Sequence, residues 1–257
     1  MRNVWTICRR ELYAYFVSPI AWVLLAMFAL LSGFFAMIMS SNFVQETIIS
    51  QMRSQGQSVP MSINEMVIAP LFGNISVISL FFIPLIGMRL FAEEKRQGTI
   101  ELLVTSPVQD VEIVIGKWLA AVLMYACLLA LLVFDISFLF VYGSPDAKPV
   151  ASAFLGMLLQ GAALLAFMAF FSALTKNQIV AGSVGFGFSL ALWILSWTSS
   201  LGDTPTTRFF SYLSVVTHME SFSRGVIDSK DLIYYLSMIF LGLFLTTRSL
   251  ESLRWRS

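Results

Sequence analysis

One ionisable side chain, Asp135, lies well inside an apolar run of the sequence. A carboxylate at such a depth in a membrane helix is costly, and it commonly serves a proton relay or contacts a substrate. A hydrogen bond to a neighbouring helix would explain the same residue without any role in transport. We favour the structural interpretation and keep Asp135 as a candidate intramembrane polar site.

No other residues have the spacing of a catalytic or metal site. The sequence contains one His, no glycine-rich P-loop, and two Cys residues, Cys8 and Cys127, that are far apart. A metal site needs clustered ligands, and nucleotide chemistry needs a loop that cradles phosphates. We therefore predict no catalytic residue, no metal ligand and no cofactor in this chain.

The most charged segment is residues 92–117, which hold eight of the chain's 31 charges. Gly98 interrupts the segment, Thr99 can cap a short helix, and Glu101 falls in the first turn of that helix. A second helix is predicted to begin at Ser106-Pro107 and to continue into an apolar run. Short rigid helices could pass a push from a soluble partner into a membrane, whereas a solvated connector is an equal alternative.

Composition places these segments in a membrane protein. Charged residues make up 12% of the chain and apolar residues 58%, whereas a soluble domain carries about a quarter charged residues. The fold class predicted is all-α, a polytopic membrane protein in one domain over residues 1–257. A net charge of +1 excludes a strongly basic nucleic-acid binder, so no nucleic-acid partner is expected.

Six apolar runs are long enough to cross about 30 Å of hydrocarbon as helices. The predicted spans are residues 20–39, 71–88, 118–142, 150–174, 178–202 and 232–247. Residues 40–69 predict a short ordered loop. Eleven Lys and Arg residues flank the spans on the side of the N-terminus and five lie on the other side, which predicts that both termini are cytoplasmic.

Two further elements lie outside the spans. Residues 1–19 predict an N-terminal helix lying on the membrane, with a cytoplasmic extension of the first span as the alternative. Residues 203–231 alternate polar and apolar side chains, which predicts one or two short re-entrant helices on the external side. Phe209, Phe210, His218 and Glu220 are candidates for an external gate there, against plain interfacial packing. A lone His such as His218 is more often a helix-surface residue than a proton switch.

Three stretches of sequence resemble ABC-2 type transporter permeases. They are FAEEKRQGTIELLVTSPV at 91–108 followed by EIVIGK at 112–117, RELYAYFVSPI at 10–20, and HMESFSRGVID at 218–228. The chain is most similar to the gliding-motility-associated permease branch, and more distantly to the nitrous-oxide-reductase accessory permeases. The resemblance covers the whole chain in order.

The resemblance implies a coupling element that faces an ATPase, formed by Glu93, Glu94, Gly98, Thr99, Ile100, Glu101 and Leu102. Lys176 and Asn177 would form a smaller second cytoplasmic contact.

The function implied by the resemblance is that of a permease subunit in an ATP-binding cassette exporter. A separate ATPase subunit would bind ATP and Mg²⁺, and a second permease copy or a related permease would complete the transporter in the bacterial inner membrane. The alternative is a membrane anchor or scaffold of an ATPase-driven motility or assembly complex, with a periplasmic-domain accessory protein as a further partner.

Overall fold

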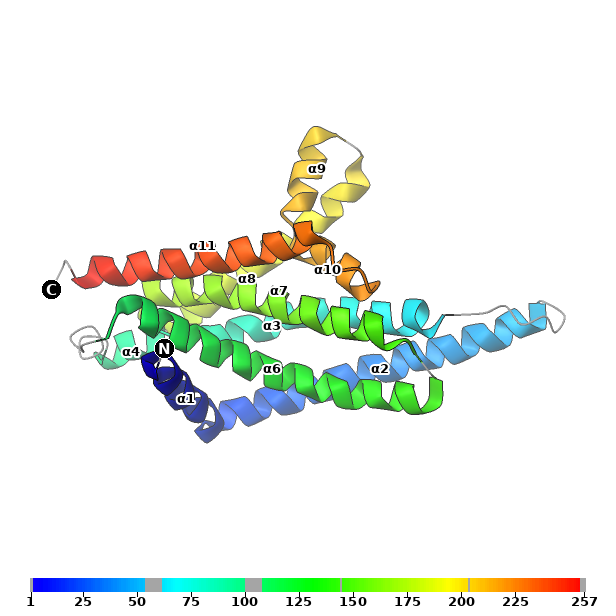
Figure 1. Cartoon of the computed structure of the whole chain (residues 1–257), viewed down its shortest axis with the longest axis horizontal. Coiled ribbons are helices and arrows are strands. Elements are labelled where there is room, and N and C mark those ends of the chain that lie inside the picture. Colours follow the sequence, from blue (N-terminus) through cyan, green and yellow to red (C-terminus); the bar gives the residue numbers. More distant parts are fainter. Residues whose placement is uncertain (1, 54–61, 100–107, 144, 203, 255–257) are drawn as a thin grey trace.

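The computed structural model describes residues 2–53, 62–99, 108–143, 145–202 and 204–254. Within these ranges the chain forms helices and no strand. Six segments are long and apolar enough to cross a membrane, which confirms an all-α polytopic membrane protein. The long helices run side by side along the longest axis of the molecule (Figure 1). They are α2 (Pro19–Arg53), α3 (Ala69–Gly87), α6 (Asp110–Gly143), α7 (Ala147–Leu174), α8 (Gln178–Ile194) and α11 (Ser229–Arg254).

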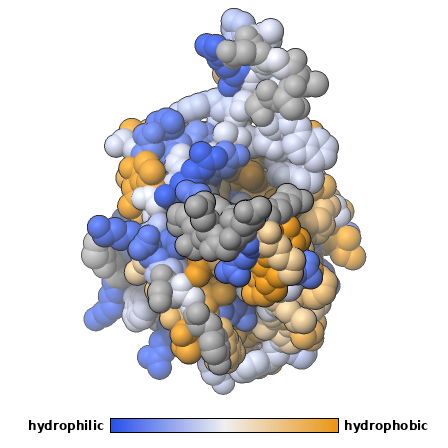
Figure 2. Space-filling view, turned by 90° about the vertical axis from the view of Figure 1, so that its right-hand side faces the viewer, coloured by the Kyte–Doolittle hydropathy of each residue, from blue (hydrophilic) through white to orange (hydrophobic). Residues whose placement is uncertain are grey.

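Shorter helices lie at the two ends of this bundle (Figure 1). At one end, which we call the N-terminal end, are α1 (Arg2–Val17) and α4 (Ala92–Gln97), together with the last residues of α11. Toward the opposite, distal end are the π-helix η1 (Asn64–Ile68), the 3-10 helix η2 (Leu195–Leu201), α9 (Pro205–Tyr212) and α10 (Val215–Ser223). The pair formed by η2 and α9 stands away from the bundle. Hydrophilic side chains gather on part of the distal end, beside apolar surface (Figure 2).

The N-terminal helix is separate from the first span. The chain turns at Ser18, whose backbone N–H bonds to the carbonyl of Tyr15 at 3.1 Å, and α2 then begins at Pro19. Proline fits the first position of a helix because the missing N–H would have no partner there. Residues 2–17 therefore form a helix of their own that does not continue into the first span without a break.

Two helix boundaries differ from the sequence expectation. The predicted loop at 40–69 is wrong in its first part, because α2 continues to Arg53. No Gly or Pro interrupts residues 40–53, and the hydroxyls of Ser40 and Thr47 bond back to carbonyls one turn earlier. The predicted helix start at Ser106-Pro107 lies outside the described residues, but α6 begins only at Asp110, with Asp110 and Glu112 in its favourable first turn.

Helix α7 is the centre of the bundle, packed against α3, α6, α8, α10 and α11. Buried polar pairs join it to its neighbours. Ser76 of α3 donates to the Gln160 side-chain oxygen at 2.7 Å, and the Trp118 indole of α6 donates to the Ala162 carbonyl at 2.9 Å. Such bonds hold membrane helices together where apolar contact alone gives no preference over lipid.

Close approach of α6 and α7 depends on a glycine. A Cβ atom added at Gly161 would collide with the ring of Tyr125, which is fully buried and whose hydroxyl donates to Ser79 at 3.0 Å. At Gly187 of α8, by contrast, an added Cβ atom would meet nothing within 4 Å.

We expect Gly161→Ala to destabilise the protein by about 2 kcal/mol, because overpacking forces the ring and its hydroxyl out of place. Gly187→Ala is the matched control and should leave stability unchanged or slightly higher, since alanine favours the helix. Thermal unfolding of the detergent-purified variants measures both effects. Equal unfolding midpoints for the two variants would contradict this account of the packing.

Candidate coupling site

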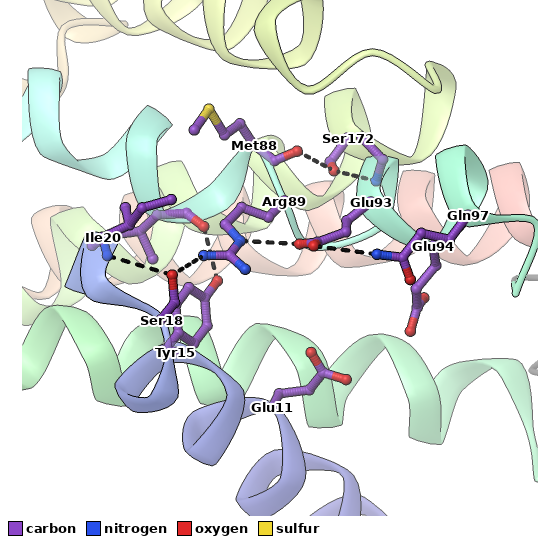
Figure 3. A network of polar contacts seen from close by, with 12 residues as sticks. Glu11, Tyr15, Ser18, Ile20, Met88, Arg89, Glu93, Glu94, Gln97 and Ser172 are labelled. Carbon is purple, nitrogen blue, oxygen red and sulfur yellow. Dashed lines mark hydrogen bonds and ion pairs between the residues drawn. The ribbon is translucent and has the colours of Figure 1, made fainter.

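The turn between α3 and α4 is fastened to the end of α7 by one buried hydroxyl (Figure 3). Ser172 donates to the Met88 carbonyl at 2.9 Å and accepts from the N–H groups of Phe91 and Ala92, both at 3.0 Å. One side chain thus forms hydrogen bonds with three backbone groups at the end of α3 and the start of α4, where helices leave such groups without a partner. The Lys95 ammonium also donates to the Ala173 carbonyl, so α4 is held against α7 at two points.

The joint between α1 and α2 docks on this turn. The Tyr15 hydroxyl donates to the Ile86 carbonyl at 2.8 Å, and the Arg89 guanidinium lies 5.7 Å from the centre of the Tyr15 ring. Arg89 also donates to the Ser18 hydroxyl at 3.3 Å and to the Glu93 carboxylate at 3.1 Å (Figure 3). The end of α3 and the start of α2 are therefore joined through α1.

A buried lysine joins α1, α4 and α6. Lys117 of α6 has a side chain that is 2% exposed, and its ammonium lies 2.9 Å from Glu94 and 3.2 Å from Glu11. The Arg10 guanidinium lies 2.7 Å from Glu11 and 3.7 Å from Glu94. Two cations and two carboxylates thus alternate across three helices, and we call these four residues the Lys117 junction.

The chain can place these charges together because α1 packs closely on α6 at Gly116. A Cβ atom there would lie 2.9 Å from the Cβ atom of Ile7 and 3.0 Å from the Val4 carbonyl oxygen. Only glycine admits this approach, which puts the next residue, Lys117, within reach of Glu11. The face of α1 toward α6 includes the fully buried Cys8.

The charges of the Lys117 junction shift the pKa of Glu11. Burial alone would raise the pKa of the Glu11 carboxyl. The Lys117 ammonium and the Arg10 guanidinium together lower the pKa by more than burial raises it, so the pKa is below its ordinary value. A lowered pKa in the folded state means that the ionised carboxylate stabilises the fold. This stabilisation is present above the ordinary titration range of Glu and is lost as the pH falls through the lowered pKa.

The structure describes four of the seven residues predicted for the coupling element. Glu93 and Glu94 lie on α4 with their carboxylates directed to Arg89 and Lys117, and Gly98 ends α4 in the left-handed conformation with φ 74°. Thr99 follows, with its N–H bonded to the Glu94 carbonyl at 3.1 Å. Ile100, Glu101 and Leu102 lie outside the described residues.

The predicted second contact lies at the same end of the bundle. Asn177 caps α8, its side-chain oxygen accepting from the Ile179 N–H at 2.9 Å, and Lys176 is exposed. Both residues follow directly after Ser172 and Ala173, which hold α4. The described residues of the two candidate contact regions therefore lie at the same end of the bundle.

Asp135 contacts a neighbouring span. Its carboxylate accepts from the fully buried Ser32 hydroxyl of α2 at 2.6 Å, and a Cβ atom at Gly33 would lie 3.7 Å from its other oxygen. Asp135 thus joins α2 to α6 in the distal half of the bundle.

The four candidate gate residues are not brought together. Phe209 and Phe210 are exposed on α9, and the Glu220 side chain is exposed on α10. The expectation that His218 is a helix-surface residue is wrong, because it is 4% exposed and its ring contacts Asp231 of α11. Asp231, the partner of the His218 ring, lies 13 positions away in the sequence, so the pattern of neighbouring residues does not predict this contact.

Sequence reasoning missed the residues that build the junction. Lys117, Arg10 and Arg89 were counted as positive charges that flank the spans, and Lys117, Arg10 and Glu11 also lie in the stretches that resemble the permease family. No ion pair between these residues was predicted. A usable signal was the position of Lys117 between Gly116 and Trp118 at the start of an apolar run, because a buried ammonium needs a carboxylate partner. Among the described residues no group of three His, Cys, Asp or Glu could hold a metal ion.

We expect Lys117→Met to destabilise the protein by about 3 kcal/mol, because the change leaves the carboxylates of Glu11 and Glu94 close together without their shared cation. Lys148→Met, at an exposed lysine of α7, is the matched control and should be neutral. Adding Glu11→Gln and Glu94→Gln to Lys117→Met should recover part of the loss. If Lys117→Met unfolds at the same temperature as the control, the junction does not stabilise the fold.

For Asp135 we expect the Asn variant to keep wild-type stability, because an amide oxygen can still accept from Ser32. Asp135→Leu and Ser32→Ala should each cost about 1 kcal/mol, the scale of hydrogen bonds between membrane helices. Thermal unfolding of the purified variants and of the Ser32→Ala/Asp135→Leu pair tests the coupling. An Asn variant that is fully stable yet loses ATP-linked activity in the assembled complex would instead assign Asp135 to the transport pathway.

The comparisons with known proteins agree with this architecture. A search of curated proteins found no significant match. The model of the family described as ABC-2 family transporter protein matches residues 42–247, which include four of the six candidate spans whole, the last part of the first and most of the sixth. With the six-helix fold, this match shows that the chain belongs to the ABC-2 transporter family and is a membrane permease component.

Proposed function

We propose that the chain is the permease subunit of an ATP-binding cassette exporter, and that a separate ATPase subunit drives it. The observation that carries the proposal is the Lys117 junction, which joins α1, α4 and α6 at the end of the bundle where the predicted coupling element lies. A connector that merely linked two spans would not need a buried ammonium shared by three helices, because burying charges is costly unless the geometry is fixed.

The proposed movement begins at the segment between α4 and α6. Nucleotide binding would draw two ATPase subunits together and displace this segment. Because Ser172 and Lys95 tie α4 to α7 and Lys117 ties it to α6, the displacement would tilt these spans as one body. The distal helices α9 and α10, with Phe209, Phe210, His218 and Glu220, would then serve as the outer gate.

The partners proposed follow from the family and from the earlier resemblance. The ATPase subunit would bind ATP and Mg²⁺, and a second copy of this chain or a related permease would complete the pathway. We place the protein in the bacterial inner membrane. Both termini would lie in the cytoplasm, because eleven Lys and Arg residues flank the spans on the side of the N-terminus and five on the other side. The gliding-motility-associated branch remains our proposed subgroup, with a periplasmic-domain protein as an accessory partner.

A pair of substitutions at Gly98 tests the coupling role. Gly98 has φ 74°, which proline cannot adopt, whereas asparagine tolerates the left-handed region. We expect Gly98→Pro to insert into the membrane normally but to stimulate the partner ATPase about tenfold less than wild type, and Gly98→Asn to stimulate it as wild type does.

The chain purified without a partner should neither bind nor hydrolyse ATP.

The measurement uses affinity capture of the tagged chain from native membranes, mass spectrometry of the captured proteins, and ATP hydrolysis in proteoliposomes. Capture of an ATP-binding cassette ATPase by wild type and by Gly98→Asn supports the proposal. Full ATPase stimulation by Gly98→Pro would contradict the coupling assignment. Capture of the ATPase with no ATP-dependent rearrangement of the distal helices would favour the anchor or scaffold alternative.

A further inference from the structure

At the distal end, a buried histidine and a buried aspartate face each other between α10 and α11. His218 is 4% exposed and Asp231 is 1% exposed. The Nδ1 atom of His218 lies 2.6 Å from Oδ1 of Asp231, and its Nε2 atom lies 2.8 Å from the carbonyl oxygen of Tyr212. Both ring nitrogens therefore have an oxygen as their partner.

Counting protons fixes the state of this pair. A carbonyl oxygen can only accept, so Nε2 of His218 must carry a proton. An ionised carboxylate also only accepts, so the contact between Nδ1 and Asp231 requires a second proton. A separation of 2.6 Å is short, as charge-assisted bonds are. The pair therefore holds one proton more than a neutral imidazole beside an ionised carboxylate.

The surroundings favour an imidazolium next to a carboxylate. Asp231 lies in the first turn of α11, where the helix dipole favours negative charge. The Tyr234 ring stacks on the His218 ring with centroids 3.9 Å apart, and the Tyr212 ring approaches edge-on at 4.9 Å. Aromatic faces attract cations. The second oxygen of Asp231 has no hydrogen-bond partner among the described residues, so the contact with His218 is the side-chain hydrogen bond that the structure gives this carboxylate.

The pair fastens the turn between α9 and α10 to α11. His218 holds the Tyr212 carbonyl, while the hydroxyls of Tyr234 and Tyr235 donate to the carbonyls of Leu213 and Val215, both at 2.7 Å. Three neighbouring carbonyls are thus anchored around the buried pair. Loss of the shared proton would leave one ring nitrogen with a lone pair facing an oxygen, either that of the Asp231 carboxylate or that of the Tyr212 carbonyl, so one of the two hydrogen bonds of the ring would be lost.

We propose that His218 and Asp231 form a proton-binding site that latches α9 and α10 to the start of α11. The latch is closed while the pair holds its shared proton and opens when that proton is lost at high pH. A cavity of ≈ 560 Å³, lined by both residues among others, gives the proton a route to solvent. The proposal concerns this chain alone and does not depend on an ATPase partner.

Other charged and titratable groups surround the latch. Arg224 is paired with Glu220 at 4.0 Å, and Lys230 with Asp228 at 3.1 Å. Glu65 and Asp146 line a second cavity together with Glu220. The titratable groups that line the first cavity or contact the His218 ring are Arg208 and Tyr212 of α9, Glu220 of α10, Arg224 directly after α10, and Lys230, Tyr234 and Tyr235 of α11. Asp231 is the group that bonds Nδ1.

The chain contains a single His, so histidine labelled with ¹⁵N reports on His218 alone. We expect nuclear magnetic resonance of the labelled protein in nanodiscs to show both ring nitrogens protonated at about pH 6 and one of them deprotonated at about pH 9. In Asp231→Asn the amide N–H can donate to a neutral ring, so Nδ1 should be unprotonated at both values. An unprotonated Nδ1 in wild type at the lower pH would overturn the proposal.

Hydrogen exchange of residues 205–223 tests the latch itself. After correction for the intrinsic effect of pH, we expect wild type to lose protection about tenfold between pH 6 and pH 9, as for loss of a buried hydrogen bond. Asp231→Asn should stay protected at both values, and Glu65→Gln, at an exposed carboxylate of the second cavity, should behave as wild type. Protection in wild type that does not change with pH, or an Asp231→Asn variant that still responds, would contradict the latch.

Discussion

The contact on which the N-terminal end of this permease depends is the buried ammonium of Lys117 between the carboxylates of Glu94 and Glu11. Each of the three groups comes from a different helix, and burying the Lys117 ammonium would be costly without the two carboxylates beside it. The close approach of α1 to α6 at Gly116 brings them together. The Lys117 junction therefore holds α1, α4 and α6 together as one rigid body, at the end of the bundle where the ATPase partner is proposed to bind.

The rest of the structure is connected to this body through α7. Helix α7 contacts most of the other spans, and its ends hold opposite parts of the molecule. Near one end, Ser172 binds the turn between α3 and α4. Near the other, Ser152 donates to the Phe222 carbonyl of α10 at 2.8 Å. One central helix thus connects the candidate coupling site to the helices proposed as the outer gate.

Much of the fold could be predicted from the sequence because hydrocarbon thickness sets the length of an apolar run. All six spans were predictable on that basis. The separate N-terminal helix, the break at Gly98 and short helices in residues 203–231 were predictable from amphipathic patterns and from glycine. The length of α2 beyond Met39 was not, because Ser, Thr and Gln side chains are common both in loops and in solvated helix ends. The start of α6 at Asp110 was not predicted, because Asp and Glu favour the first turn of a helix but are also common in loops.

The site was less predictable, for a different physical reason. The periodicity of α1 shows an apolar face but cannot show whether that face meets lipid or another helix, so its packing on α6 was missed. Likewise a charge count treats Lys117 as one more basic residue at a span end, and a single His gives no sign of a partner on another helix. Contacts between distant segments, such as Glu11 with Lys117 and His218 with Asp231, depend on the tertiary fold.

The central claim is that α1 and α4 move as one body when nucleotide acts on the partner. Spin labels on cysteines introduced at the exposed Tyr13 of α1 and Arg96 of α4, with Cys8 and Cys127 replaced by alanine, would report their separation by pulsed electron paramagnetic resonance. The account predicts the same distance distribution in the nucleotide-free complex and in the complex trapped with ATP and vanadate. A shift of several ångström between the two states would contradict it.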